Sequence, residues 1–243
     1  MTDIINSISG LLWGHILVYL LIAAGLFFTI RLGFIQFVQF PHMIKVMFQS
    51  RQGSDGGISS FQAFCTSLAA RVDTGNMAGV AVALYLGGAG AIFWMWLIAL
   101  IGMATSFAES TLAQAYKIRD EEGNFRGGPA YYMEYGLGKR WMGVVFSLCL
   151  ILAFGLVFNA VQSNSIAAAF EVAFGIPNYI VGIALVIGSG IIIFGGLKTI
   201  SRFAELAVPF MAAAYLVVAL YICAVNYTEL PNVFMHVIRS AFG

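Results

Sequence analysis

A short polar segment interrupts a long apolar stretch of the chain. Residues 59–86 are long enough to cross a lipid bilayer and are otherwise apolar. Their middle holds Arg71, Asp73, Thr74, Gly75 and Asn76. Charged side chains at that depth cost about 3 kcal/mol each on insertion scales, and they mark functional sites by default. A helix interrupted there exposes main-chain carbonyls and N–H groups, which can hold a cation and an anionic substrate group.

A purely structural role is the alternative for this segment. Gly75 and Gly79 form a GxxxG pattern, which commonly marks close packing of two membrane helices. Arg71 and Asp73 could form an ion pair that only stabilises the fold. Packing explains the glycines but not the polar side chains beside them. We therefore interpret the segment as a substrate or ion site.

A second polar cluster lies in another long apolar stretch. Asn159, Gln162 and Ser163 are spaced so that they share one face of a helix. Their side chains could bind a substrate or could hydrogen-bond to neighbouring helices, and the residue types do not decide between these roles. Glu109 and Glu205 lie near the ends of apolar stretches. We interpret them as partners of basic residues, with ion coupling as the alternative.

The composition indicates the class of protein that must position these residues. Of 243 residues, 60% are hydrophobic and only 9% are charged, whereas about 25% are charged in an average soluble domain. The apolar stretches lie at about 11–30, 59–86, 91–116, 141–170, 178–196 and 204–226. They do not alternate with the period of two that membrane strands require. The chain is therefore predicted to be an all-α polytopic membrane protein with about six transmembrane helices.

Several other classes of protein and site are disfavoured. The formal net charge of +1 gives no basic surface for a nucleic acid partner, so membrane lipid is the expected surrounding. The three histidines lie far apart and do not predict a metal site. An intramembrane enzyme needs a nucleophile and base, or a metal cluster, within the spans. Neither pattern occurs, so no catalytic residue is assigned.

The positions of lysine and arginine predict the orientation. Ten of the 12 basic residues lie in the alternate linkers 31–58, 117–140 and 197–203. Cytoplasmic loops carry an excess of these residues, so the N-terminus is predicted to lie outside. The linker 31–58 mixes aromatic with polar side chains, which suits a helix in the plane of the membrane interface. The linker 117–140 is predicted to be a hydrophilic loop.

Six segments carry a resemblance to a known family. They are residues 59–63 (SSFQA), 67–72 (SLAARV), 74–81 (TGNMAGVA), 90–96 (GAIFWMW), 127–133 (GGPAYYM) and 208–211 (VPFM). Together they resemble the alanine or glycine:cation symporter family, over nearly the whole chain. The resemblance implies a leucine-transporter type of fold, with two inverted five-helix repeats and a discontinuous first core helix. It also implies sodium- or proton-driven uptake of alanine, glycine or serine across a bacterial inner membrane.

The resemblance assigns roles to individual residues. The segment 74–76 is similar to the unwound stretch of the family, so Thr74 and Gly75 are expected to bind the substrate carboxylate through a hydroxyl and a backbone N–H. Gln162 resembles the substrate-facing glutamine of the family. The expected ligands of sodium are the carbonyls near Ala69, Ala70 and Val72 and the side chain of Asn76. No cofactor other than the coupling ion is implied.

One residue departs from the family pattern. The family usually has glycine at the position of Asp73. A carboxylate there could pair with Arg71, add a ligand to the cation site or repel the substrate carboxylate. It also keeps proton coupling open as an alternative to sodium. The choice among alanine, glycine and serine stays open as well.

The length is the second departure, because the family is nearly twice as long. Residues 1–243 are expected to form one transmembrane domain from the N-terminal half of a symporter. In this division, 1–58 is the first span with its linker, 59–226 the first repeat and 227–243 the start of a connection to a second repeat. The site of such transporters lies between the repeats, so a C-terminal half is an expected partner and transport by this chain alone is not expected. A non-transporting membrane assembly or regulatory protein is the alternative.

Overall fold

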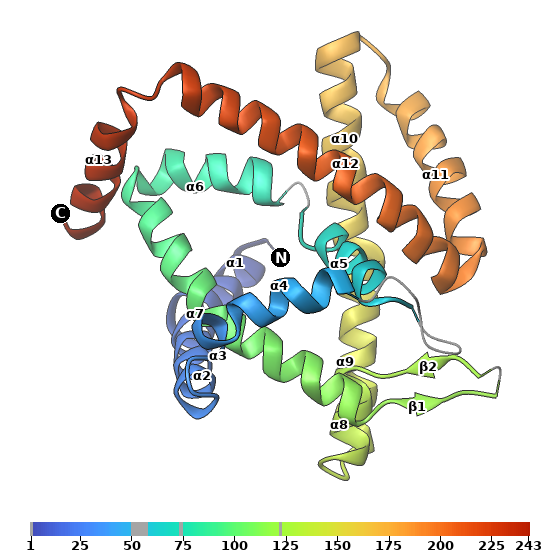
Figure 1. Ribbon diagram of the computed structural model, residues 1–243. Coiled ribbons are helices and arrows are strands. Elements are labelled where there is room, and N and C mark those ends of the chain that lie inside the picture. The colour runs from blue at the N-terminus through green and yellow to red at the C-terminus, as the bar shows by residue number, and fades with distance from the viewer. Residues whose placement is uncertain (1, 50–57, 73–74, 122) are drawn as a thin grey trace.

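The computed structural model describes residues 2–49, 58–72, 75–121 and 123–243, which are mainly helical (Figure 1). The elements before residue 90 are α1 (Thr2–Leu11), η1 (Leu12–Leu17), α2 (Val18–Arg31), α3 (Ile35–Val38), α4 (Phe40–Gln49), α5 (Ser60–Ala69), η2 (Gly75–Gly79) and α6 (Val80–Gly87). The next are α7 (Gly90–Ala115), β1 (Ile118–Arg119), β2 (Phe125–Arg126) and α8 (Pro129–Tyr135). The last are α9 (Arg140–Leu150), η3 (Ile151–Phe158), α10 (Asn159–Phe174), α11 (Asn178–Phe194), α12 (Gly196–Val225) and α13 (Leu230–Phe242). The segments labelled η are π-helical.

Four helices are long and apolar enough to cross a membrane. They are Asp3–Arg31, Gly90–Ala115, Arg140–Phe174 and Gly196–Val225. The π-helical segments η1 and η3 lie within the first and third of these helices without interrupting them. The four correspond to the predicted spans at 11–30, 91–116, 141–170 and 204–226. The prediction of a helical polytopic membrane protein is thereby confirmed.

The other two predicted spans take different forms. The stretch 178–196 forms α11, a helix of 17 residues that follows Pro177 and ends before Gly195. It is apolar but shorter than the four long helices. The stretch 59–86 is divided among α5, η2 and α6. Length and composition therefore identify four spans. The predicted number of about six is reached only if α11 and the divided stretch 59–86 also cross the membrane.

Both long linkers contain regular structure, which was predicted for linker 31–58 but not for linker 117–140. The linker 31–58 contains α3 and the exposed helix α4, which Figure 1 shows running toward α5. The linker 117–140, predicted to be a loop, contains an antiparallel hairpin and α8. In the hairpin Ile118 pairs with Arg126 and Arg119 pairs with Phe125. Strands of two residues are too short to give a recognisable pattern of alternation.

The helices contact one another through small side chains. Helix α2 packs against α7, and a methyl group added to Gly25 would overlap with Ile101. Helix α12 packs against α5, and α13 packs against the start of α7. Close approach through small residues is typical of membrane helices, where lipid provides no hydrophobic force to bring helices together.

Apolar side chains cover most of the surface. Phe194 is 93% exposed and Val172 is 89% exposed, whereas only a few apolar residues, such as Cys65 and Ala104, are fully buried. This distribution fits a chain whose solvent is lipid. Several hydroxyl groups within the helices donate to the carbonyl four residues earlier; Ser147 Oγ, for example, donates to Gly143 O at 2.9 Å. Such bonds satisfy polar groups that hydrocarbon cannot.

The contact between α7 and α13 generates a prediction at Gly90. Its amide donates to Ser240 Oγ at 3.1 Å, and an added Cβ would lie 2.8 Å from the Cα of Ala241. We expect Gly90→Ala to lower the free energy of unfolding in detergent by about 1–3 kcal/mol, because overpacking forces the two backbones apart. Gly182→Ala is the control, since nothing lies within 4 Å of its added Cβ. Equal unfolding free energies for the two variants would contradict this packing.

Candidate functional site

Helix α5 leads into the interrupted segment, and a capping box fixes its start. The amide of Gln62 donates to Ser59 Oγ at 3.1 Å, and the amide of Ser59 donates to Gln62 Oε1 at 3.1 Å. This pair satisfies two main-chain donors at the helix start. Gln62 Nε2 also donates to Glu205 Oε2 on α12 at 2.8 Å. Among the described residues, the carboxylate of Glu205 therefore accepts a hydrogen bond from an amide and not from the basic residue that was predicted.

An apolar cluster holds α5 along α12. Cys65 of α5 is fully buried against Ala204 and Val208 of α12. Phe61 and Leu68 pack against the same cluster. These contacts and the bond from Gln62 keep α5 in place up to its last turn. The beginning of the interrupted segment is thus fixed relative to α12.

The helix stops inside the apolar stretch. Helix α5 ends at Ala69, and the amides of Arg71 and Val72 both donate to the carbonyl of Leu68, at 3.0 and 2.9 Å. The carbonyls of Ala69 and Ala70 therefore lie at the C-terminal end of α5. The next helical segment, η2, begins at Gly75 and continues as α6.

Two of the predicted site residues, Asp73 and Thr74, lie outside the described residues. Asn76 lies within η2, and its side-chain nitrogen donates to the main-chain carbonyl of Arg71. This bond crosses the interruption and joins its two sides. The side-chain nitrogen of Asn76 is a donor, so the side-chain oxygen is the atom that could bind a cation.

Arg71 links the interrupted segment to α7. Its Nη1 donates to Ser67 Oγ, one turn earlier on α5, and its Nη2 donates to Ser106 Oγ on α7 at 3.2 Å. The predicted pairing of Arg71 with Asp73 involves a residue outside the described part of the chain. The described bonds direct the guanidinium group toward α7.

A cavity of about 320 Å³ adjoins this arginine. Its polar lining residues are Arg71, Thr105, Ser106 and Glu109, and its apolar lining comes mainly from α2 and α7. Glu109, predicted to pair with a basic residue, thus lines the same cavity as Arg71. Burial raises the pKa of the Tyr132 phenol in α8, and the negative charge of Glu109 raises it further. The carboxylate therefore acts electrostatically on both the cavity and α8.

Ser67 and Ser106 were not predicted to belong to the site. Ser106 lies 35 positions after Arg71, so their contact depends on the packing of two helices. A signal was nevertheless present on α7. Thr105, Ser106 and Glu109 fall on neighbouring positions of a largely apolar helix, at spacings that share a face.

The second predicted cluster lies on α10. Asn159 is exposed, and its Nδ2 donates to the carbonyl of Gly155 on the preceding turn at 3.2 Å. Gln162 and Ser163 are half-buried. Within the described part of the chain, α10 packs mainly against η3 and α11, and neither of these elements carries the interruption.

Comparisons with known proteins give consistent results. The model of the sodium:alanine symporter family matches residues 1–243. The probable sodium/glutamine symporter GlnT of Bacillus subtilis (strain 168) is 50% identical over 244 residues, which cover 100% of this chain and 51% of that protein. The amino-acid carrier protein AlsT of the same organism is 50% identical over 241 residues, covering 99% of this chain and 51% of AlsT. The sodium/alanine symporter AgcS of Methanococcus maripaludis is 41% identical over 248 residues, covering 99% and 54% respectively. The chain thus spans about half the length of these relatives.

The bond between Arg71 and Ser106 generates a prediction about local stability. We expect Ser106→Ala to increase hydrogen exchange in the peptide that covers residues 67–80, because the interrupted segment loses its hydrogen bond to α7. Thr111→Ala is the matched control, since Thr111 lies on the same helix and, among the residues that the structure describes, its hydroxyl donates within α7, to the carbonyl of Phe107 at 2.8 Å. Mass spectrometry of the detergent-solubilised chain measures the exchange. Equal exchange in the two variants would show that this bond does not restrain the segment.

Proposed function

Because the chain belongs to the sodium:alanine symporter family, we propose that it takes part in cation-coupled symport of small neutral amino acids, such as alanine or glycine, across the plasma membrane. The family consists of transporters and not enzymes, and its name implies sodium as the coupling ion. The observation that carries the proposal is the interruption between Ala69 and Gly75 in an otherwise apolar stretch. Irregular backbone at membrane depth is tolerated where it lines a cavity or is covered by protein.

The end of α5 is the proposed cation site. Helix carbonyls carry partial negative charge at a C-terminal end, which favours a bound cation. The proposed ligands are the carbonyls of Ala69, Ala70 and Val72, the side-chain oxygen of Asn76 and the carboxylate of Asp73. In support, the amides of Arg71 and Val72 both donate to the carbonyl of Leu68. The carbonyls of Ala69 and Ala70 follow this last bonded carbonyl in the chain.

The charge on Arg71 opposes a cation bound nearby. Its bonds to Ser67 and Ser106 direct the guanidinium group toward α7. In this proposal a carboxylate at position 73 offsets the remaining repulsion and strengthens the cation site. Proton coupling through the same carboxylate is the alternative to sodium coupling.

The start of the following helical segment is the proposed substrate site. Main-chain N–H groups and the positive end of the helix dipole favour a carboxylate at such a position. Thr74 and Gly75 are the proposed carboxylate ligands, and Gln162 is the proposed partner of the rest of the substrate. The names of the relatives include both glutamine and alanine. We therefore propose a neutral amino acid, with its size set by side chains outside this segment.

The proposed architecture follows that of inverted-repeat transporters. In it, residues 59–226 form the first five-helix repeat, 1–58 provide the first span and its linker, and 227–243 begin the connection to a second repeat. The N-terminus lies outside a bacterial inner membrane. Since the site of such a transporter lies between its repeats, the chain supplies one side of the site and a C-terminal half supplies the other.

A chimera tests the proposed function. Residues 1–243 replace the matching half of the Bacillus subtilis relative GlnT, and the product is reconstituted in proteoliposomes. We expect the chimera to accumulate labelled alanine, glycine or glutamine under an inward sodium gradient but not under an inward potassium gradient, which is the control. We expect the 243-residue chain alone to accumulate none of them. A correctly inserted chimera that accumulates none of these amino acids, with either a sodium or a proton gradient, would favour a non-transporting assembly or regulatory role.

A single substitution in the same chimera tests the role of Asp73. We expect Asp73→Gly to change the half-saturating sodium concentration by about ten-fold, because one charged ligand near a bound cation contributes on the order of 1–2 kcal/mol in a partly solvated site. Glu229→Gln is the control, since it also removes one negative charge, but at the start of α13 and not in the interrupted segment. We expect it to leave the half-saturating sodium concentration unchanged. Uptake kinetics that are identical with aspartate and glycine at position 73 would refute a role for this carboxylate in coupling.

A further inference from the structure

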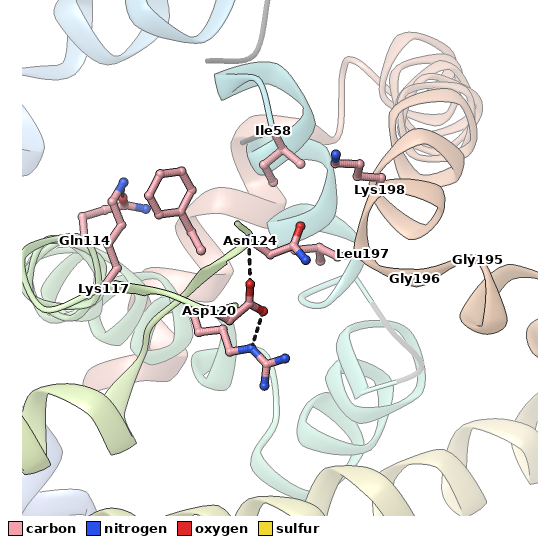
Figure 2. A pocket seen from close by; sticks show the side chains of 11 residues that line it. Ile58, Gln114, Lys117, Asp120, Asn124, Gly195, Gly196, Leu197 and Lys198 are labelled. Carbon is pink, nitrogen blue, oxygen red and sulfur yellow. Dashed lines mark hydrogen bonds and ion pairs between the residues drawn. The ribbon is translucent and has the colours of Figure 1, made fainter. Parts of the chain in front are cut away.

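A second, larger cavity lies away from the interrupted helix. Its volume is about 600 Å³, and it lies between the β1–β2 hairpin, the end of α7 and the start of α12 (Figure 2). Helices α7 and α12 are two of the four spanning helices, and the cavity adjoins the last turn of the first and the first turn of the second. It therefore lies where two spans leave the membrane, on the side predicted to be cytoplasmic.

The described lining of this cavity is predominantly cationic. It contains Lys117, Arg126 and Lys198 but one carboxylate, that of Asp120. Both oxygens of that carboxylate are already engaged, as Figure 2 shows. Oδ1 accepts from the amide of Asn124 at 2.7 Å, and Oδ2 accepts from Arg126 Nε at 2.9 Å. One carboxylate neutralises one of the three cations, so the described lining residues carry an excess of positive charge.

Two lysines approach the cavity from opposite walls. Lys117 is held by a bond from its Nζ to Gln114 Oε1 at 2.9 Å, and the same Nζ lies 4.4 Å from the centre of the Phe125 ring. Neither contact is with a carboxylate, and Lys117 forms no ion pair with a residue that the structure describes. Lys198 comes from the far wall, on the first turn of α12 (Figure 2). It forms no ion pair with any described residue.

The backbone of α12 adds to the positive potential. The helix begins at Gly196, and Gly195, Gly196, Leu197 and Lys198 all line the cavity. The N–H groups of a first helical turn lack partners within the helix, and the positive end of the helix dipole lies there. Because α12 is 30 residues long, this terminus belongs to a stable helix.

We propose that this cavity binds a phosphate group, and that its position favours the phosphate of an anionic phospholipid over the free ion. Two lysines and a helix N-terminus line one space, and these are groups that recognise phosphate in proteins. Basic cavities between helices on the cytoplasmic side of membrane proteins bind lipid headgroups. Ile58 and Leu197 provide apolar contacts for the glycerol and the first acyl carbons. The inference does not depend on the proposed transport activity.

Lipid retention by the 243-residue chain tests the proposal. The chain is placed in nanodiscs of phosphatidylcholine with a minor fraction of phosphatidylglycerol, extracted into mild detergent and analysed by native mass spectrometry. We expect retained phosphatidylglycerol. We also expect the apparent affinity to fall about five-fold for Lys117→Gln or Lys198→Gln, and about 25-fold for the double variant, which is the size of effect that single basic residues have on anionic lipid binding.

Matched variants separate this cavity from general electrostatics. Lys139→Gln makes the same change of charge within the same linker but outside the cavity, and we expect it to retain phosphatidylglycerol as the unsubstituted chain does. The variants Lys117→Arg and Lys198→Arg keep the charge and are expected to restore retention. Thermal unfolding of each variant in detergent shows that a loss of lipid is not a loss of fold.

Inorganic phosphate distinguishes the two sources of the ligand. If phosphate stabilises the chain against heat, and only when Lys117 and Lys198 are present, while phosphatidylglycerol is not retained, the cavity is a site for the free anion. If phosphatidylglycerol is retained through the same two lysines, the ligand is the lipid headgroup. If retention and stabilisation are as sensitive to Lys139→Gln as to Lys198→Gln, or insensitive to both, the proposal is overturned.

Discussion

A helix that ends inside a membrane must find partners for the main-chain groups of its last turn, because hydrocarbon offers none. Two carbonyls at the end of α5 find such partners nearby. The Leu68 carbonyl accepts from the amides of Arg71 and Val72, and the Arg71 carbonyl accepts from the side-chain nitrogen of Asn76. The asparagine in this apolar stretch is therefore explained first by the backbone, whereas the arginine side chain is explained by its bonds to Ser67 and Ser106. Any cation or substrate bound here adds to these partners or replaces them.

The spans that could be predicted were those whose apolar stretches are uninterrupted. The residues of α7, for example, form a long helix within one residue of the predicted limits, because composition alone decides which stretches enter the membrane. Helix α12 ends one residue before its predicted end but begins at Gly196, eight residues before its predicted start. The limits of α11 were also predicted closely, because the apolar stretch 178–196 contains the helix Asn178–Phe194, which Gly195 ends. The β1–β2 hairpin was missed because the bond between Asp120 and Arg126, and not a repeating pattern, characterises it.

The candidate site was predictable in part. The residue types at positions 71 and 76 locate the interruption, since neither arginine nor asparagine suits the centre of an apolar helix. Ser106 was not predictable, because its bond to Arg71 depends on how α5 and α7 pack. Gln162 was assigned only through family resemblance, because its residue type suits a substrate site and a bond between helices equally well. Local chemistry is visible in a sequence, whereas contacts between distant helices are not.

The basic residues of the linkers serve two physical requirements at once. Lys117, Arg126 and Lys198 come from two separate linkers whose charge predicts the orientation of the chain, and the fold brings them to one cavity. Positive charge at the ends of spans favours the cytoplasmic side whatever the exact positions of the side chains. A cavity for phosphate needs the same charges at defined positions. The position of the cationic groups, and not their number, is therefore what distinguishes a headgroup site from the ordinary bias of cytoplasmic loops.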